Sequence, residues 1–179
     1  MENINFNKIK KILIIGGTGM GKSTLADNIG KQLDLPICHI DAIHFKENWI
    51  ERDVKERDEI IRRKINEPKW ILDGLYKSTL KESIEKADLV VILWFSKLTQ
   101  LKGIIKRHLK NYGKERNDIP GCVDKLDVKF IRFTLDFKKK NKSIIENILR
   151  ENNKNKILIF KKQKQLNKWY ENNFKTKIC

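Results

Sequence analysis

Eight consecutive residues near the start of the chain have the types and spacing needed to hold a chain of phosphate groups. They read Gly16-Gly17-Thr18-Gly19-Met20-Gly21-Lys22-Ser23 and fit the pattern G-x-x-x-x-G-K-[ST] without a mismatch. Glycines let backbone N–H groups wrap anionic oxygens, and a helix that begins near Lys22 directs its positive end at them. Lys22 is then expected at the outer phosphates and Ser23 at a magnesium ion. The alternative is a decayed loop that binds only adventitious phosphate.

The segments on either side of this loop support nucleotide binding. A strand is predicted over residues 9–16, and a helix over residues 22–33 because Leu25, Ile29 and Leu33 recur at helical spacing. A buried strand followed by the loop and a helix is the context in which this motif binds nucleotides. The predicted nucleotide-binding residues are Gly16, Gly17, Thr18, Gly19, Met20, Gly21, Lys22, Ser23 and Thr24.

Two acidic residues are expected close to the loop because each follows an apolar stretch. Asp41 comes after a short buried strand predicted over residues 37–40, and Asp73 ends an apolar strand that begins at Trp70. Open parallel sheets bind ligands at the carboxyl ends of their strands. Asp73 is predicted to hold magnesium, directly or through water, and Asp41 to orient or deprotonate an acceptor hydroxyl. The alternative for both is a helix-capping or turn residue.

Aromatic and arginine side chains complete the set of candidates. Phe45 and Trp49 follow Asp41 and are candidates to stack on an acceptor ring, with a place in the core as the alternative. Arg107 and Arg116 are predicted to close over the phosphates, because planar guanidinium groups meet the oxygens of a transferring phosphoryl group in pairs. A solvated surface is the alternative for any one arginine. The predicted substrate-binding residues are Asp41, Phe45, Trp49, Asp73 and Gly74.

Apolar periodicity over the remaining chain predicts alternating strands and helices. The expected elements are helices over 53–66 and 77–86, a strand over 89–95, and a helix with the stripe Leu98, Leu101, Ile104, Ile105, His108 and Leu109; these precede a loop over 114–122, helices over about 130–140 and 144–149, a strand over 157–160 and a closing helix. This alternation predicts a parallel, helix-covered sheet in one domain spanning residues 1–179.

The formal charge of +16 on the 179 residues is unevenly distributed. Residues 1–100 contain 17 Lys and Arg against 15 Asp and Glu, whereas residues 101–179 contain 22 against 8. The basic second part suits nucleic acid or small phosphate-bearing molecules as partners, and the run Lys138-Lys139-Lys140-Asn141-Lys142 is its strongest local patch. The alternative is a solvated lysine-rich surface that results from biased codon usage.

Several classes of protein are not expected. The longest apolar runs are too short to cross a bilayer and the first residues lack a leader pattern, so a cytoplasmic protein without membrane partners is predicted. Three widely spaced cysteines indicate neither a disulfide framework nor a zinc site. The histidines His39, His44 and His108 lack metal-ligand spacing and are expected to pack or lie at the surface.

Four segments together carry a family resemblance. They are Gly16–Thr24, His39-Ile40-Asp41 with Trp49 downstream, Trp70–Gly74, and Ile119-Pro120-Gly121-Cys122 before a Phe-rich basic helix. In these segments the chain, from about Lys11 to Tyr170, resembles the bacterial DNA topology modulation proteins, which look like relatives of adenylate kinase and the small metabolite kinases.

This resemblance implies an α/β fold of the P-loop NTPase type, similar to nucleoside monophosphate kinases. It implies three α/β/α layers, five parallel strands in the order 2-3-1-4-5, and a short mobile lid over about 110–125 that carries Arg116. It also implies binding of ATP and magnesium by Gly19, Gly21, Lys22, Ser23 and Thr24.

One departure from those kinases limits what the resemblance implies. They follow the Asp-Gly of the third strand with an aromatic residue, Pro and Arg, whereas this chain has Leu75-Tyr76-Lys77. No arginine occurs between Arg63 and Arg107, so the usual acceptor-phosphate clamp and an adenylate kinase activity are not expected.

The sequence therefore predicts an ATP-dependent phosphotransferase with a small-molecule or nucleotide acceptor. The predicted catalytic residues are Lys22, Asp41, Arg107 and Arg116. The predicted magnesium ligands are Ser23 and Asp73. The alternative is a nucleotide-dependent DNA-binding or regulatory protein that influences DNA topology, which a continuous basic face would favour.

Overall fold

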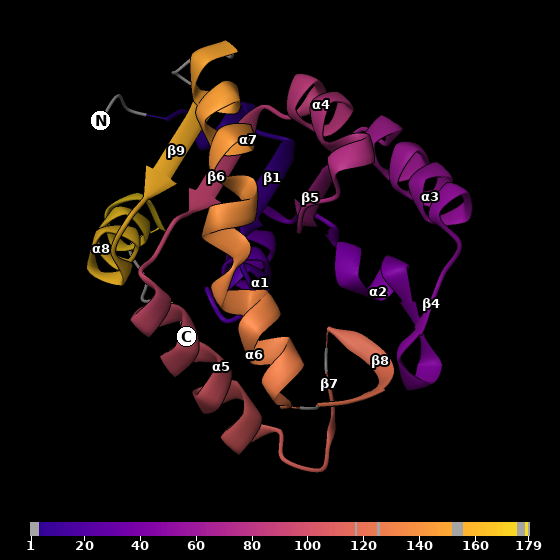
Figure 1. Ribbon diagram of the computed structural model, residues 1–179. Helices are drawn as coiled ribbons and strands as arrows, with labels where there is room; N and C mark the ends of the chain where they lie inside the picture. The colour runs from indigo at the N-terminus through magenta and orange to yellow at the C-terminus, as the bar shows by residue number, and fades with distance from the viewer. Residues whose placement is uncertain (1–3, 117, 125, 152–155, 175–177, 179) are drawn as a thin grey trace.

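A five-stranded parallel sheet forms the centre of the structure (Figure 1). The computed structural model describes residues 4–116, 118–124, 126–151, 156–174 and 178. The strands are β1 (Lys11–Gly16), β2 (Ile37–His39), β5 (Trp70–Asp73), β6 (Leu89–Leu93) and β9 (Ile157–Phe160). They lie in the order β2-β5-β1-β6-β9, which is the predicted order 2-3-1-4-5 when only these five strands are counted. The intervening labels belong to two small two-stranded sheets, β3–β4 and β7–β8.

Position in the sheet decides how deeply each strand is buried. The run Ile12–Ile15 in β1 is at most 1% exposed because β5 and β6 flank it and helices cover both of its faces. The predicted burial of the second strand is wrong, since β2 is an edge strand whose residues are only half-buried. Its predicted last residue, Ile40, instead begins the short helix α2 (Ile40–His44).

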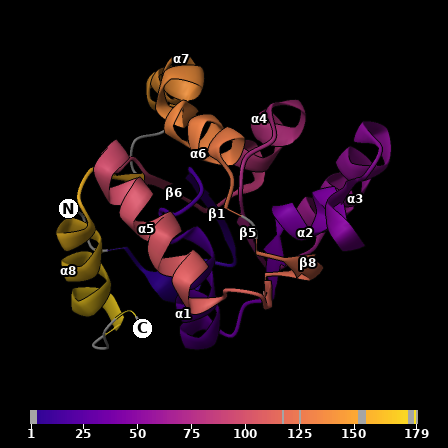
Figure 2. The same ribbon diagram turned by 60° about the horizontal axis from the view of Figure 1, so that its bottom comes forward.

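Helices cover both faces of the sheet and make the predicted α/β/α layers (Figure 2). Helices α1 (Lys22–Leu33) and α8 (Gln163–Phe174) pack on one face with Ile12 and Ile14. Helices α3 (Val54–Asn66), α4 (Lys77–Lys86) and α7 (Phe137–Glu151) pack on the other with Leu13 and Ile15. The two sets of strand residues alternate because successive side chains point to opposite faces of a strand.

Helix α5 (Lys97–Lys110) leads from the sheet to a small hairpin, which faces α2, and α6 (Val128–Leu135) leads from the hairpin to α7 (Figure 1). The predicted loop over 114–122 is wrong here, because β7 (Glu115–Arg116) and β8 (Ile119–Val123) pair antiparallel. Pro120 prevents a helix but is tolerated in a short edge strand, and Gly121 adopts the left-handed region at φ 74°. Residues 117 and 125, within the predicted lid range, lie outside the described residues.

The predicted apolar stripe of α5 is only partly correct. Leu98 and Leu109 are more than 70% exposed, whereas Gln100 and Ile104 are fully buried. The buried face of α5 is therefore the one that carries Gly103, where the helix contacts the loop before α1.

The other short elements are η1 (Phe6–Lys8), β3 (Phe45–Lys46), η2 (Glu47–Trp49) and β4 (Ile50–Glu51). None of the helices in the described part of the chain is long and apolar enough to cross a membrane.

Candidate phosphate-binding site

The loop between β1 and α1 has the backbone conformation that the motif predicts. Gly19 and Gly21 adopt left-handed conformations, with φ of 78° and 82°, which L-residues with a Cβ rarely adopt. Gly21 caps α1 without any side-chain hydrogen bond to the first turn. The first N–H groups of the helix have no intrahelical partner, so this 12-residue helix presents donors and its positive end to an anion.

Helix α5 packs so tightly on the loop that glycine is required on both sides of the contact. A Cβ added at Gly103 would lie 2.0 Å from the carbonyl oxygen of Gly19. A Cβ added at Gly17 would lie 2.4 Å from Nε2 of Gln100, which donates to the carbonyl of Thr134 at 3.0 Å. The loop is therefore held in one shape by the protein itself, which suits a preorganised phosphate cradle.

The hairpin brings a carboxylate that the sequence interpretation missed directly to this loop. The Ser23 hydroxyl donates to Oδ2 of Asp118 at 3.1 Å. Arg116 donates to both oxygens of Asp118, with Nε at 2.9 Å and Nη2 at 2.6 Å. Burial acts to raise the pKa of Asp118, but the bonds from Arg116 and Ser23 lower it overall. The only available signal was the position of Asp118 two residues after a predicted arginine.

Of the two arginines predicted to close over the phosphates, Arg116 is buried and Arg107 is partly buried. Arg116 is 6% exposed, and Nε of Arg107 lies 3.1 Å from Oδ1 of Asp124 without the alignment of a hydrogen bond. Burial and the neighbouring Arg116 lower the pKa of Arg107. Burial opposes the charge of Arg116 as well, but the bonds to Asp118 raise its pKa. A solvated surface is therefore the wrong interpretation for these two residues.

Asp41 was predicted at the end of a strand, but it lies in the first turn of α2. Its charge acts to raise the pKa of Arg107 and that of Arg116, so Asp41 lies within electrostatic range of both guanidinium groups. The strand before Asp41, β2, pairs with β5, whereas β1 pairs with β5 and β6, so of the two acidic residues only Asp73 ends a strand beside that of the loop.

Asp73 ends β5 and is 4% exposed, but its contact is with a histidine. Its Oδ1 lies 2.9 Å from Nδ1 of His39, whose Nε2 is 3.8 Å from Oδ1 of Asp27. The hydrogen bond to Asp73 raises the pKa of His39, against the opposing effect of burial. The structure therefore pairs Asp73 with a half-buried histidine, whereas the hydroxyl of Ser23 is paired with Asp118.

The predicted aromatic residues Phe45 and Trp49 form an edge-to-face pair with ring centroids 5.2 Å apart. The indole Nε1 of Trp49 donates to the carbonyl of Val123 in the hairpin at 2.8 Å. The guanidinium of Arg116 lies 5.7 Å from the Trp49 ring. Trp49 therefore links the segment after Asp41 to the hairpin.

Gly74, predicted at the acceptor side, is buried against α2. Its φ is 134°, and an added Cβ would lie 2.9 Å from the Cβ of Ile40. A side chain at this position would push α2, and Asp41 with it, away from β5.

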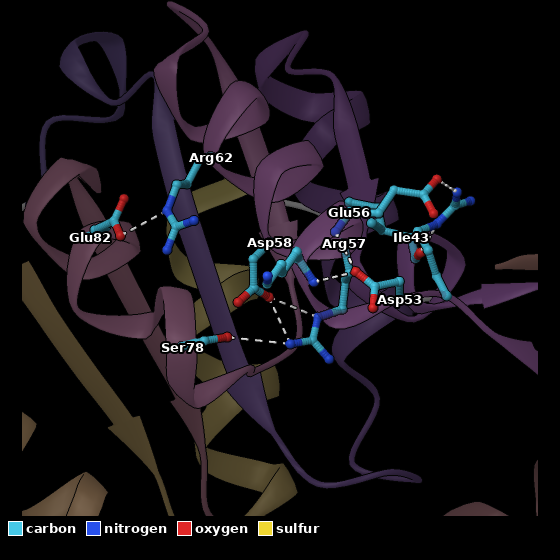
Figure 3. A network of polar contacts seen from close by, with 10 residues as sticks. Ile43, Asp53, Glu56, Arg57, Asp58, Arg62, Ser78 and Glu82 are labelled. Carbon is cyan, nitrogen blue, oxygen red and sulfur yellow. Dashed lines mark hydrogen bonds and ion pairs between the residues drawn. The ribbon is translucent and has the colours of Figure 1, made fainter.

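A buried arginine on α3, Arg57, contacts Asp58 and Ser78 (Figure 3) and lies close to Tyr76, in the segment where nucleoside monophosphate kinases carry the acceptor clamp. Arg57 donates through Nε and Nη2 to Asp58 and through Nη2 to Ser78, and its guanidinium lies 4.0 Å from the centroid of the Tyr76 ring. Burial raises the pKa of Tyr76, and the nearby charge of Asp41 adds to this effect. The sequence interpretation missed Arg57 because a charged residue in a charged helix resembles a solvated one.

Within the described residues, no group of three or more His, Cys, Asp or Glu side chains is arranged to hold a metal ion. Magnesium commonly binds through one or two protein oxygens together with substrate phosphates and water. The Ser23 hydroxyl and the nearby carboxylates fit that mode of binding, in which the phosphates supply the remaining ligands.

Comparison with known proteins supports a nucleotide-binding fold. The profile of the ATPase family associated with various cellular activities (AAA) matches residues 12–93, from β1 to β6. The ATP-dependent protease ATPase subunit HslU is 34% identical over 79 residues in Helicobacter pylori strain G27 and 33% identical in Helicobacter acinonychis. Each alignment covers 44% of this chain and only 17% of HslU.

A solved structure shows the fold over almost the whole chain. Shikimate kinase from Bacteroides thetaiotaomicron superimposes with a TM-score of 0.54 at 18% identity, covering 94% of this chain and 99% of that enzyme. The chain therefore shares the fold of this structure.

Proposed function

We propose that this protein is an ATP-dependent phosphotransferase that acts on a small-molecule or nucleotide acceptor. The observation that carries the proposal is the preformed glycine loop at the N-terminus of α1, to which Asp118 links Arg116 through its bonds to Ser23 and to the guanidinium. The small-kinase fold and the match to an ATPase family support it.

Some residues of the chain would bind the phosphate donor, and others would bind and activate the acceptor. The loop N–H groups and Lys22 would bind the phosphates, and Ser23 and Asp73 would hold magnesium, directly or through water. Bound Mg-ATP supplies the transferable phosphoryl group. Arg107 and Arg116 would stabilise the negative charge that spreads over its oxygens, and Asp41 would orient or deprotonate the acceptor hydroxyl.

A comparison of Lys22→Ala with Lys31→Ala tests this proposal. Both lysines lie on α1, but Lys31 is exposed at the far end of the helix. With a panel of metabolites and nucleosides, acceptor-dependent ADP release should fall about 100-fold or more in Lys22→Ala, because a charge-stabilising donor is lost. Lys31→Ala should match the wild type. If no acceptor gives ADP release above the Lys22→Ala background, the proposal is wrong.

A second candidate, a nucleotide-dependent DNA-binding protein, is favoured by one surface feature. A groove of about 390 Å³ beside Trp94 is lined by four lysines, by Glu146, which lies 3.8 Å from Lys142, and by three apolar residues; the lysines are Lys138, Lys139, Lys142 and Lys161. Burial and the neighbouring Lys161 lower the pKa of Lys138, so these like charges are close together. Ammonium groups beside an aromatic ring suit a nucleic-acid strand. The resemblance to DNA topology modulation proteins belongs to this candidate and stays a prediction.

Anisotropy of a labelled single-stranded oligonucleotide tests the second candidate. Its affinity should fall steeply between about 50 and 200 mM salt and should change when ATP is added. The double variant Lys138→Ala/Lys161→Ala should weaken binding, whereas Lys164→Ala, at an exposed lysine of α8, should not. An oligonucleotide affinity that does not change when ATP is added, or that is the same in both variants, would exclude this function.

A further inference from the structure

We propose that Asp118, carried by the β7–β8 hairpin, is a positioning residue that completes the metal side of the phosphate loop. The inference rests on the proposed function and assigns to the hairpin the acid that acts through Ser23.

The carboxylate of Asp118 joins two groups that are both expected to act on the phosphates. Its Oδ2 accepts from the Ser23 hydroxyl at 3.1 Å and from Nη2 of Arg116 at 2.6 Å. Its Oδ1 accepts from Nε of Arg116 at 2.9 Å. One side chain thus orients both the hydroxyl of the loop and the guanidinium of the hairpin.

The chemistry of a hydroxyl explains why such an acceptor is useful. A serine hydroxyl has one proton and two lone pairs, so an acceptor that takes the proton leaves the lone pairs available to a hard cation. Partners of this kind orient metal ligands and raise metal affinity. Asp73 was predicted at the metal, but its Oδ1 is bonded to His39. The acid bonded to Ser23 therefore comes from the hairpin.

The hairpin reaches Ser23 because it is seated on the segment after α2. Trp49 donates through Nε1 to the carbonyl of Val123 at 2.8 Å, and the thiol of Cys122 donates to the carbonyl of Lys46 at 3.4 Å. A Cβ on Gly121 would lie 2.5 Å from Cγ of Glu47, so the approach is close. Asp118 contacts Ser23 only when the hairpin packs on the segment after α2. A cation held by Ser23 should therefore stabilise this packed position of the hairpin, and the packed hairpin should in turn raise the affinity for the cation.

The test is the magnesium dependence of ADP affinity, measured with a fluorescent ADP analogue and without turnover. Asp118→Asn removes the carboxylate charge at Ser23, and Glu115→Gln is the matched control, since Glu115 lies in the same hairpin and accepts from the N–H of Gly121. Affinity without magnesium should be equal in all three proteins. The gain in affinity on adding magnesium should fall about tenfold or more in Asp118→Asn and remain in Glu115→Gln.

A second readout separates positioning from a loss of hairpin structure. Trp49 contacts the hairpin, so its emission reports seating, and Trp49→Phe identifies its contribution among the four tryptophans. Magnesium should shift this emission in the ADP complex of the wild type and not in that of Asp118→Asn. Asp118→Glu keeps the charge and should retain part of the magnesium effect.

Two results contradict the inference in different ways. If the wild type shows magnesium-dependent ADP binding and Asp118→Asn keeps the full effect, Asp118 has no positioning role and the proposed function stands. If Lys22→Ala binds ADP as well as the wild type does, the proposed function fails and this inference fails with it.

Discussion

At the scale of single residues, paired charges surround the phosphate loop. Ser23 and Arg116 share Asp118, whereas His39 and Asp73 form a separate pair at the end of β5. Each carboxylate is at least partly buried and is bonded to a hydroxyl or a basic group. The contribution of each hydrogen bond to stability therefore depends on which of its two partners is protonated.

The His39–Asp73 pair predicts a stability that depends on pH. Because the pKa of His39 is raised in the folded protein, the pair stabilises fully below the unfolded pKa and the effect is lost as pH rises through the folded value. His39→Gln should therefore lower the free energy of unfolding by about 1 kcal/mol more at pH near 5.5 than at pH near 8.5. Urea denaturation at both pH values measures this. A difference that stays constant with pH would contradict the prediction.

At the scale of elements, two helix contacts determine the shape of the site. Helix α5 packs on the loop through Gly103, and α3 is joined to α4 by two arginines, one buried and one exposed (Figure 3). A glycine and two arginines make these contacts, and the apolar periodicity of their helices does not predict such a role for them.

Gly103→Ala should destabilise the protein although alanine favours helices. At a free helix position this change would stabilise by about 1 kcal/mol. Here the added Cβ would lie 2.0 Å from a backbone oxygen, so a loss of about 1–3 kcal/mol and weaker ATP binding are expected. Lys106→Ala, at an exposed position of α5, is the control for thermal unfolding and ATP titration. Equal stability of the two variants would contradict the prediction, because it would mean that α5 can shift away from the loop to make room for the added Cβ.

The two arginines that join α3 to α4 should differ strongly in their effect on stability. Arg57 and Asp58 have side chains only 8% exposed, whereas Arg62 and Glu82 are more than 40% exposed. Arg57→Ala removes the hydrogen bonds from the guanidinium to the buried Asp58, which keeps Ser78 as a neighbour, and should cost about 1.5–3 kcal/mol. Arg62→Ala should cost less than about 1 kcal/mol in the same urea denaturation experiment. Similar losses in both variants would contradict this assignment of burial.

At the scale of the whole molecule, the positive charge and the phosphate loop both favour anions. The formal charge of +16 destabilises the compact state because its positive groups repel one another. Anions of many kinds would therefore stabilise the protein weakly, without binding at a specific site. A specific nucleotide effect must therefore be separated from this general one.

Thermal unfolding at moderate salt makes that separation. Mg-ATP at about 100 times its dissociation constant should raise the melting temperature by roughly 5–10 °C in the wild type. Lys22→Ala should lose this shift, while the smaller shift from sulfate should be the same in both proteins. An ATP shift that survives in Lys22→Ala would mean that the general charge, and not the loop, binds the nucleotide.

Local features of this protein could be predicted from the amino-acid sequence. The motif at residues 16–23 predicted the loop, and hydrophobic periodicity predicted the five core strands and most helices, because both signals depend on neighbours within a few residues. The resemblance supplied the order of the strands, which the structure confirms.

Tertiary structure alone decided which charged groups meet. Asp118 lies 95 residues from Ser23, and the hairpin that carries it was predicted as a loop. Arg57 and Gly103 gain their roles from packing against other elements. Such contacts depend on the distance between elements after folding, which the spacing of residues along the chain does not contain.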